Sequence, residues 1–179
     1  MAKSDRRVID KVFVLLGVAT MLLLVVIGSL AWWGYSFSSD MVKKELVAQK
    51  IVFPPKGSPA LDPTEFPGLQ QYAGQAVDTG AKAKAYANEF IGAHLVKAAD
   101  GKTYAEVSTA ALADPTNAEL QKQKAILFQG ETLRGLLLNA YAFDTFAMLA
   151  QYLAVVTYLG ALVMAVLVLM GLGHISKRR

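Results

Sequence analysis

Two long apolar segments without a charged residue lie near the two ends of the chain. The first, residues 12–35, reads VFVLLGVATMLLLVVIGSLAWWGY, and the second covers residues 146–172. At 1.5 Å per residue the first would extend about 36 Å, which exceeds a hydrocarbon core of roughly 30 Å. The polar residues are concentrated between the two segments. The pattern predicts an all-α membrane protein with two transmembrane helices, 12–35 and 146–172, and a helical subdomain at 36–145.

The first helix is expected to continue beyond residue 35 as an amphipathic segment, with apolar positions at Val42, Leu46 and Val47. Pro54 and Pro55 would stop it, because proline has no amide hydrogen for the helix. Five of the six prolines lie in residues 51–68. This stretch is predicted to be a structured loop whose apolar side chains, Phe53, Leu61 and Phe66, dock on the subdomain. A mobile linker is the alternative.

Three further helices are expected in the subdomain. The first runs from Asp78 or Thr79 to Ala99, ends at a left-handed Gly101, and has an apolar stripe of Tyr86, Phe90, Ile91, His94, Leu95 and Ala98. A capping-box pattern at Thr103 and Glu106 begins a short helix with inward residues Tyr104, Val107, Ala111 and Leu112. A second capping box is expected at Thr116 and Glu119, and the last helix then continues unbroken from residue 117 to about 171. At roughly 80 Å it would extend well outside a bilayer.

Charge predicts the orientation. The net charge is +4, and residues 36–145 carry eleven bases against twelve acids, so the excess lies in the tails at 1–11 and 173–179. Basic tails favour a cytoplasmic location for both ends, which puts the subdomain on the outer side of the membrane. The first segment is interpreted as an uncleaved anchor, because it is longer than a signal-peptide core and no small-residue cleavage site follows it. No basic patch for nucleic acid is visible.

The residues offer no recognisable catalytic set. The chain has no cysteine, so disulfides, thiolate metal sites and cysteine nucleophiles are excluded. Gly101-Lys102-Thr103 is similar to the end of a phosphate-binding loop, but Val96 stands where that loop needs a glycine. His94 and His174 lie on opposite sides of the predicted bilayer and cannot share a metal. We therefore expect no catalytic, cofactor-binding or metal-binding residues, no cofactor, and no enzyme activity.

Two charged residues have less obvious roles. Asp144 lies where the second span begins, a costly place for an ionised group that faces lipid. It is expected at the headgroup level or beside a cation. Whether Arg134, Asp144 or His94 has more than a structural role is left open by the sequence.

Small residues recur at spacings of three and four on both spans. On the second span they are Ala147, Ala150, Ala154, Thr157, Ala161 and Ala165, and on the first Gly17, Gly28 and Ala31. Small residues let helices approach closely in lipid. They predict packing of the two spans on each other, packing against other subunits, or both on different faces.

Residues 45–142 resemble a family of small actinobacterial two-span membrane proteins of uncharacterised function. The strings that carry the resemblance are FPPKGSPALDP at 53–63, AYANEFIGAHL at 85–95, GKTYAEV at 101–107, ADPTNAELQ at 113–121 and ETLRGLLLNAYAF at 131–143. Members are sometimes labelled aromatic ring-opening dioxygenases, a label that the two separated histidines contradict. The resemblance implies the two-span topology and a bacterial envelope. It also suggests, by analogy of shape, an accessory subunit of a respiratory assembly.

Three functions follow as hypotheses. The first is a non-catalytic accessory or scaffolding subunit of a larger membrane complex, in contact with lipid and with other membrane subunits. The second is a self-assembling envelope protein or small channel, whose partners are copies of itself. The third is a membrane-anchored enzyme or ligand-binding module with a pocket near Tyr86, His94 and Tyr104.

Overall fold

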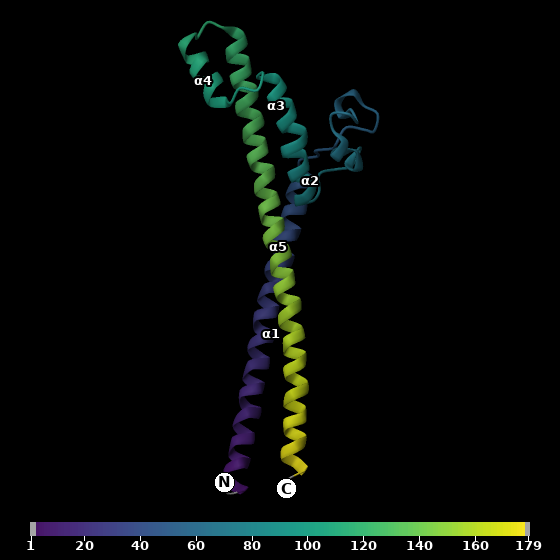
Figure 1. The fold of residues 1–179 in the computed structure, drawn as a ribbon, viewed down its shortest axis with the longest axis vertical. Coiled ribbons are helices and arrows are strands. Elements are labelled where there is room, and N and C mark those ends of the chain that lie inside the picture. Colours follow the sequence, from purple (N-terminus) through teal and green to yellow (C-terminus); the bar gives the residue numbers. More distant parts are fainter. Residues whose placement is uncertain (1–2, 178–179) are drawn as a thin grey trace. The chain divides into compact units, whose positions relative to one another are not determined.

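The computed structural model describes residues 3–177, apart from the side chains of residues 3–5 and 7. Its elements are α1 (Lys3–Ala48), η1 (Pro59–Leu61), η2 (Pro67–Tyr72), α2 (Gly80–Ala85), η3 (Tyr86–Ile91), α3 (Gly92–Ala98), α4 (Tyr104–Ala113) and α5 (Ala118–Lys177) (Figure 1). The one extended pairing in this part of the chain is a single antiparallel bridge between Val52 and Ala76. The all-α prediction is confirmed. The predicted tails also include residues 1–2 and 178–179, which lie outside the described residues.

The chain forms two compact units, and each of the long helices contributes to both. The paired-helix unit consists of Met1–Phe37 and Phe146–Arg179, and the central unit consists of Ser38–Thr145. In the paired-helix unit α1 and α5 are antiparallel. Asp10, near the start of α1, lines the same hollow as His174, near the end of α5.

The paired-helix unit turns most of its apolar side chains outward. Helices α1 and α5 are long and apolar enough to cross a membrane, and only 11% and 22% of the residues in their most apolar stretches are buried. A core helix of a soluble protein would be mostly buried. With their leucines and valines mostly exposed, the two helices are compatible with membrane insertion, as the sequence predicts.

The small residues form the contact between the two helices of this unit. Ala147, Ala154, Thr157 and Ala161 of α5 are buried, as are Gly17 and Gly28 of α1. A Cβ atom added at Gly28 would lie 2.8 Å from Oγ1 of Thr157, and one added at Gly17 would lie 2.9 Å from a methyl carbon of Val168. The predicted packing of the two spans on each other is therefore confirmed. Packing of their other faces against further subunits stays a prediction.

The last turns of α1 belong to the core of the central unit, although they differ from the prediction in two respects. Val42 and Leu46 are buried as expected, but Val47 is exposed. The helix ends at Ala48, before the two prolines, and Lys50 has a positive φ of 55°. The chain leaves the helix early because the next residues pair with a later segment: Ile51 accepts a hydrogen bond from the amide of Val77 at 2.9 Å.

The proline-rich loop packs against the central unit as a structured segment. Phe53, Leu61 and Phe66 are all buried, which confirms that they dock. The ring of Phe53 packs against Tyr72 at 5.3 Å and against Tyr86 at 5.1 Å between centroids. These apolar contacts hold the loop on the central unit, together with an ion pair between Glu65 and Lys97 of α3.

The helix predicted to start at residue 78 or 79 begins after Thr79, whose side chain accepts from the amide of Lys82. It runs through α2, η3 and α3 and ends at Ala98, and Gly101 has a left-handed φ of +77° as predicted. The middle of this helix, η3, is a π-helical turn that the sequence analysis did not expect.

The capping box at α4 is confirmed by both of its hydrogen bonds, between Thr103 and Glu106. Of the predicted inward residues Val107 and Ala111 are buried, but Tyr104 is exposed and Leu112 is 70% exposed, so those two predictions are wrong. Helix α4 is only ten residues long and turns one narrow face inward.

The prediction of a second capping box at Thr116 and Glu119 is also wrong. The amide of Leu120 donates to Oδ1 of Asn117 at 3.2 Å, whereas the Thr116 hydroxyl donates to Asp114. Asn117 therefore caps α5, because an asparagine at the residue directly before the helix reaches the same amides. Helix α5 then continues without interruption for 60 residues, to Lys177 rather than to residue 171.

The close contact at Gly28 makes a prediction about the paired-helix unit. The Gly28→Ala variant should lower the thermal stability of the purified protein in detergent, by about 1–3 kcal/mol, because its methyl group overlaps Thr157 and Tyr158. Gly34→Ala is the matched control in the same helix, since a Cβ there meets nothing within 4 Å. Equal melting temperatures for the two variants would contradict the packing described here.

Candidate functional site

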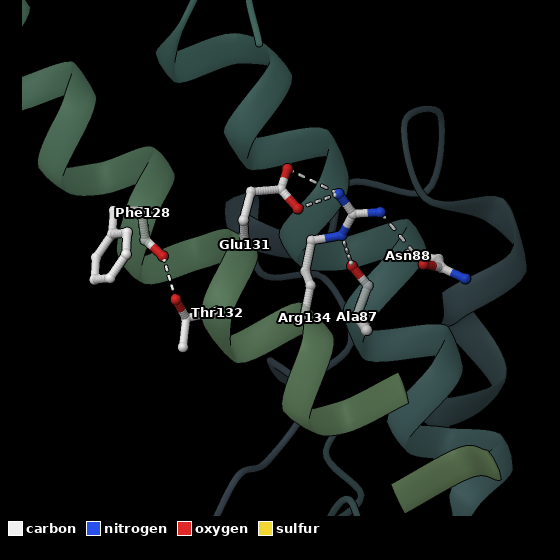
Figure 2. A network of polar contacts seen from close by, with 6 residues as sticks. All are labelled: Ala87, Asn88, Phe128, Glu131, Thr132 and Arg134. Atoms are coloured by element: carbon white, nitrogen blue, oxygen red, sulfur yellow. Dashed lines mark hydrogen bonds and ion pairs between the residues drawn. The ribbon is translucent and has the colours of Figure 1, made fainter. Parts of the chain in front are cut away.

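The most connected polar side chain of the central unit is Arg134 on α5. Its Nε donates to the carbonyl oxygen of Ala87 at 3.1 Å, and its Nη2 donates to Oδ1 of Asn88 at 3.4 Å. Its Nη1 donates to both carboxylate oxygens of Glu131 at 3.0 Å. Figure 2 shows the guanidinium directed from α5 toward the helix that carries Ala87 and Asn88. One side chain thus joins two elements that lie 47 residues apart in sequence.

The π-helical turn supplies the acceptor for this contact. In η3 the carbonyl of Ala87 receives the amide of Gly92, five residues later, and also receives Nε of Arg134. A π turn widens the helix and redirects carbonyls, and such turns are frequent at functional sites. A Cβ added at Gly92 would lie 3.8 Å from the Arg134 guanidinium carbon, an ordinary van der Waals contact, so the guanidinium lies directly beside this residue. The arrangement orients Arg134 toward the backbone and toward Glu131.

The ion pair contributes less to this network than the backbone contact does. The side chains of Arg134 and Glu131 are 26% and 47% exposed and lie three residues apart on one helix. Pairs of this kind stabilise a helix by about 0.2–0.5 kcal/mol. The bond from the charged guanidinium to a carbonyl is the stronger part. The network therefore holds α5 against η3.

Asp144 has a definite partner in the central unit. Its Oδ2 accepts from the amide of Gly80 at 3.1 Å, at the first residue of α2. A side chain at residue 80 would overlap that of Asp144, so the close approach requires glycine. A carboxylate at the start of a helix also complements the helix dipole. Asp144 is half-buried and serves as a second cap of this helix, beside Thr79.

His94 stands at the end of a row of aromatic rings. Tyr86 and Phe90 have centroids 4.8 Å apart, Phe90 and His94 4.5 Å, and Phe66 lies parallel to the imidazole at 5.8 Å. The histidine is exposed rather than inward, which corrects the predicted stripe. Its Nδ1 lies 2.7 Å from the carbonyl oxygen of Phe90. Burial raises the pKa of Tyr86.

Tyr104, the third residue of the suggested ligand pocket, is not part of this row. Its ring packs against Phe128 of α5 at 5.9 Å. It lines an open hollow of about 360 Å³ with Leu95, Leu127, Lys102, Glu131 and Arg134. The structure therefore brings Tyr86 and His94 into one aromatic row and places Tyr104 elsewhere. Lys102 and Thr103, from the phosphate-loop-like string, belong to the turn before α4.

The other ionisable groups with a shifted pKa each owe the shift mainly to a hydrogen bond from a neighbouring residue. A hydrogen bond from the backbone of Thr103 lowers the pKa of Glu106, and a hydrogen bond from Lys82 lowers the pKa of Asp78. The pKa of Tyr141 is lowered by the ammonium group of Lys84, which donates to the phenol oxygen at 3.4 Å and lies 4.6 Å from the ring centroid. These groups stabilise caps and helix contacts. Among the side chains that the structure describes, no three histidines, aspartates or glutamates converge as metal ligands.

Comparison with known proteins found no match: no family model, no characterised protein and no solved structure is similar to this chain.

Arg134 generates a prediction for the central unit. Arg134→Met should destabilise the protein by about 1–3 kcal/mol, because the guanidinium bonds to Ala87 and Asn88 are lost together. Glu131→Gln should cost less than about 0.5 kcal/mol, since it removes only an exposed ion pair. Both can be measured by chemical unfolding of the detergent-solubilised chain. If Glu131→Gln is as damaging as Arg134→Met, the backbone contact is not the important one.

Proposed function

We propose that the chain is a non-catalytic accessory or scaffolding subunit of a larger membrane protein complex. The observation that carries the proposal is that the main polar side chains of the central unit bind backbone groups of that same unit. Arg134, Asp144 and Glu106 bind backbone groups of their own unit, and Nδ1 of His94 lies beside the Phe90 carbonyl. Side chains so engaged stabilise a fold. The large outward apolar surface of the paired helices supports contact with lipid and with other spans.

The proposal includes a location in a bacterial plasma membrane, with both termini cytoplasmic and the central unit outside. The antiparallel arrangement of α1 and α5 supports placing both ends on one side. The basic tails support the cytoplasmic side. The resemblance to small actinobacterial two-span proteins supports a respiratory assembly as the complex, by analogy only.

The orientation can be tested with single cysteines, because the chain has none of its own. Ala81→Cys in the central unit and Ser176→Cys near the end of α5 both replace exposed residues. In intact cells a membrane-impermeant maleimide should label Ala81→Cys, and it should label Ser176→Cys only after permeabilisation. The reverse pattern would place the central unit in the cytoplasm.

The function can be tested by gentle extraction of the tagged protein, followed by native electrophoresis and mass spectrometry of the bands. The subunit hypothesis predicts defined partners in fixed ratio, since accessory subunits are held by specific contacts. An unrelated two-span protein with the same tag and expression level is the control for adventitious membrane proteins. Migration of the chain without any other protein would contradict the hypothesis.

A further inference from the structure

The paired-helix unit contains a hollow between its two helices, near the start of α1 and the end of α5. It has a volume of about 350 Å³, and the residues that line it lie within 10–17 of α1 and 164–174 of α5. We call it the inter-span hollow. Pockets that bind small ligands have volumes of roughly 300–1,000 Å³, so this hollow is large enough to hold part of a ligand.

Most of the wall of the inter-span hollow is apolar. It includes Phe13 and Val14 from α1, and Met164 and Leu167 from α5. Phe13 and Leu167 are 69% and 53% exposed, so the hollow opens on the outer surface of the helix pair. All four residues lie within the uncharged runs 12–35 and 146–172. In a membrane the surroundings of this opening are lipid acyl chains.

The length of the inter-span hollow matches one leaflet of a bilayer. Its lining residues extend from 10 to 17 on α1 and from 164 to 174 on α5. At 1.5 Å per residue these stretches are about 10 Å and about 15 Å long. One leaflet contributes about 15 Å, half of a hydrocarbon core of roughly 30 Å. The hollow therefore follows the depth that the acyl chain of a lipid occupies.

The two ends of the inter-span hollow differ in polarity. Asp10 and His174 line one end, whereas Gly17 and Met164 lie deeper in the uncharged runs. Asp10 comes directly before the first uncharged run, and His174 follows the second. These positions correspond to the headgroup region of a bilayer. An apolar groove with one polar end is complementary to an amphiphile, whose acyl chain and headgroup have the same order.

Charge indicates the sign of the headgroup. The tails at 1–11 and 173–179 carry seven bases and two acids. Lys11 and Lys177 are both exposed, and they lie one and three residues from Asp10 and His174 in the sequence. Basic pockets between membrane-spanning helices bind anionic headgroups. A zwitterionic headgroup has no net charge for these bases to attract, so the complementary lipid is an anionic phospholipid.

Asp10 adds a second requirement. It is the acidic residue that lines the hollow, and its side chain is partly buried. An ionised carboxylate accepts hydrogen bonds and donates none. A phosphate diester also only accepts, so the rest of the headgroup must supply the donor. Phosphatidylglycerol meets both requirements, because its phosphate complements the bases and its glycerol hydroxyls can donate to Asp10.

We propose that the inter-span hollow binds an anionic phospholipid with a hydroxyl-bearing headgroup, of which phosphatidylglycerol is the simplest. One acyl chain lies along the apolar wall, and the headgroup lies at the end that Asp10 and His174 line. The inference goes beyond the proposed function, because it assigns a lipid-binding site. It requires that α1 and α5 span a membrane, and it holds whichever side the termini face.

Three lipids with identical acyl chains test the headgroup. The full chain, purified in detergent and depleted of lipid, is titrated with each lipid, and binding is read by native mass spectrometry. Phosphatidylglycerol should bind one per chain and at least about tenfold tighter than phosphatidylcholine. Phosphatidylethanol has the same charge but no hydroxyl, so it should bind about fivefold more weakly than phosphatidylglycerol. In Asp10→Ala these two anionic lipids should bind equally. Equal binding of phosphatidylglycerol and phosphatidylcholine to the natural sequence would overturn the proposal.

Two tryptophan variants test the location. Leu167→Trp places a larger side chain in the hollow and should weaken phosphatidylglycerol binding at least about tenfold, because the acyl chain then loses its space. Leu169→Trp is the matched control on the same helix, since Leu169 is 68% exposed and lies outside the hollow. The melting temperatures of both variants verify folding, and Asp10→Ala remains as a test if Leu167→Trp unfolds. Unchanged binding by folded Leu167→Trp, or equal losses in the two variants, would overturn the proposal.

The two proposals fail in different ways. Co-purified partner proteins together with no preference for phosphatidylglycerol would overturn the lipid site and leave the accessory function standing. Selective binding of phosphatidylglycerol by a chain that migrates without any partner protein would support the lipid site and contradict the accessory function.

Discussion

The structure depends on one constraint: most apolar side chains in the apolar stretches of α1 and α5 face outward, and in a membrane they would be covered by lipid or by other helices. Lipid tails are as apolar as leucine, so the hydrophobic effect does not bring two such helices together. Their association must come from close van der Waals contact. Gly17 and Gly28 provide that contact against Val168 and Thr157, which is why a larger residue at either glycine would force the helices apart.

The central unit uses a different principle, because it contains much irregular backbone and no disulfide. Its loop between α1 and α2 is anchored by buried Phe53, Leu61 and Leu69, and the carboxamide of Gln70 donates to the backbone of Leu61. Ordering a residue costs about 1–2 kcal/mol of backbone entropy, so a long loop needs such anchors. The aromatic contacts of Phe53 with Tyr72 and Tyr86 connect this loop to the following helix.

The sequence predicted features whose physical cause is local. Absence of charge predicted the two long apolar helices, and the Thr103–Glu106 spacing predicted a cap that needs only those two residues. Prediction from the sequence failed where tertiary packing determines the local structure. Leu112 is apolar and was predicted to point inward, yet it is exposed. The π turn was not predicted, and its Ala87 carbonyl accepts from Arg134, 47 residues away, a contact that no local pattern records. Periodicity predicted that His94 points inward. The π turn at Tyr86–Ile91 precedes His94 and shifts the phase of the helix ahead of it, so the prediction failed.

Two kinds of exposed apolar surface must therefore be distinguished. Leucines and valines on the paired helices are explained by the membrane for which those helices are long enough. Phe128, Leu136 and Phe143 lie in the polar central unit, beside charged residues such as Glu131, and lipid does not account for them in the proposed topology. Phe128 packs its ring against Tyr104 of α4 at 5.9 Å, so it belongs in part to the unit's own packing. Leu136 and Phe143 lie on a helix that Arg134 and Asp144 hold against η3 and α2, and their exposure is not needed for those contacts.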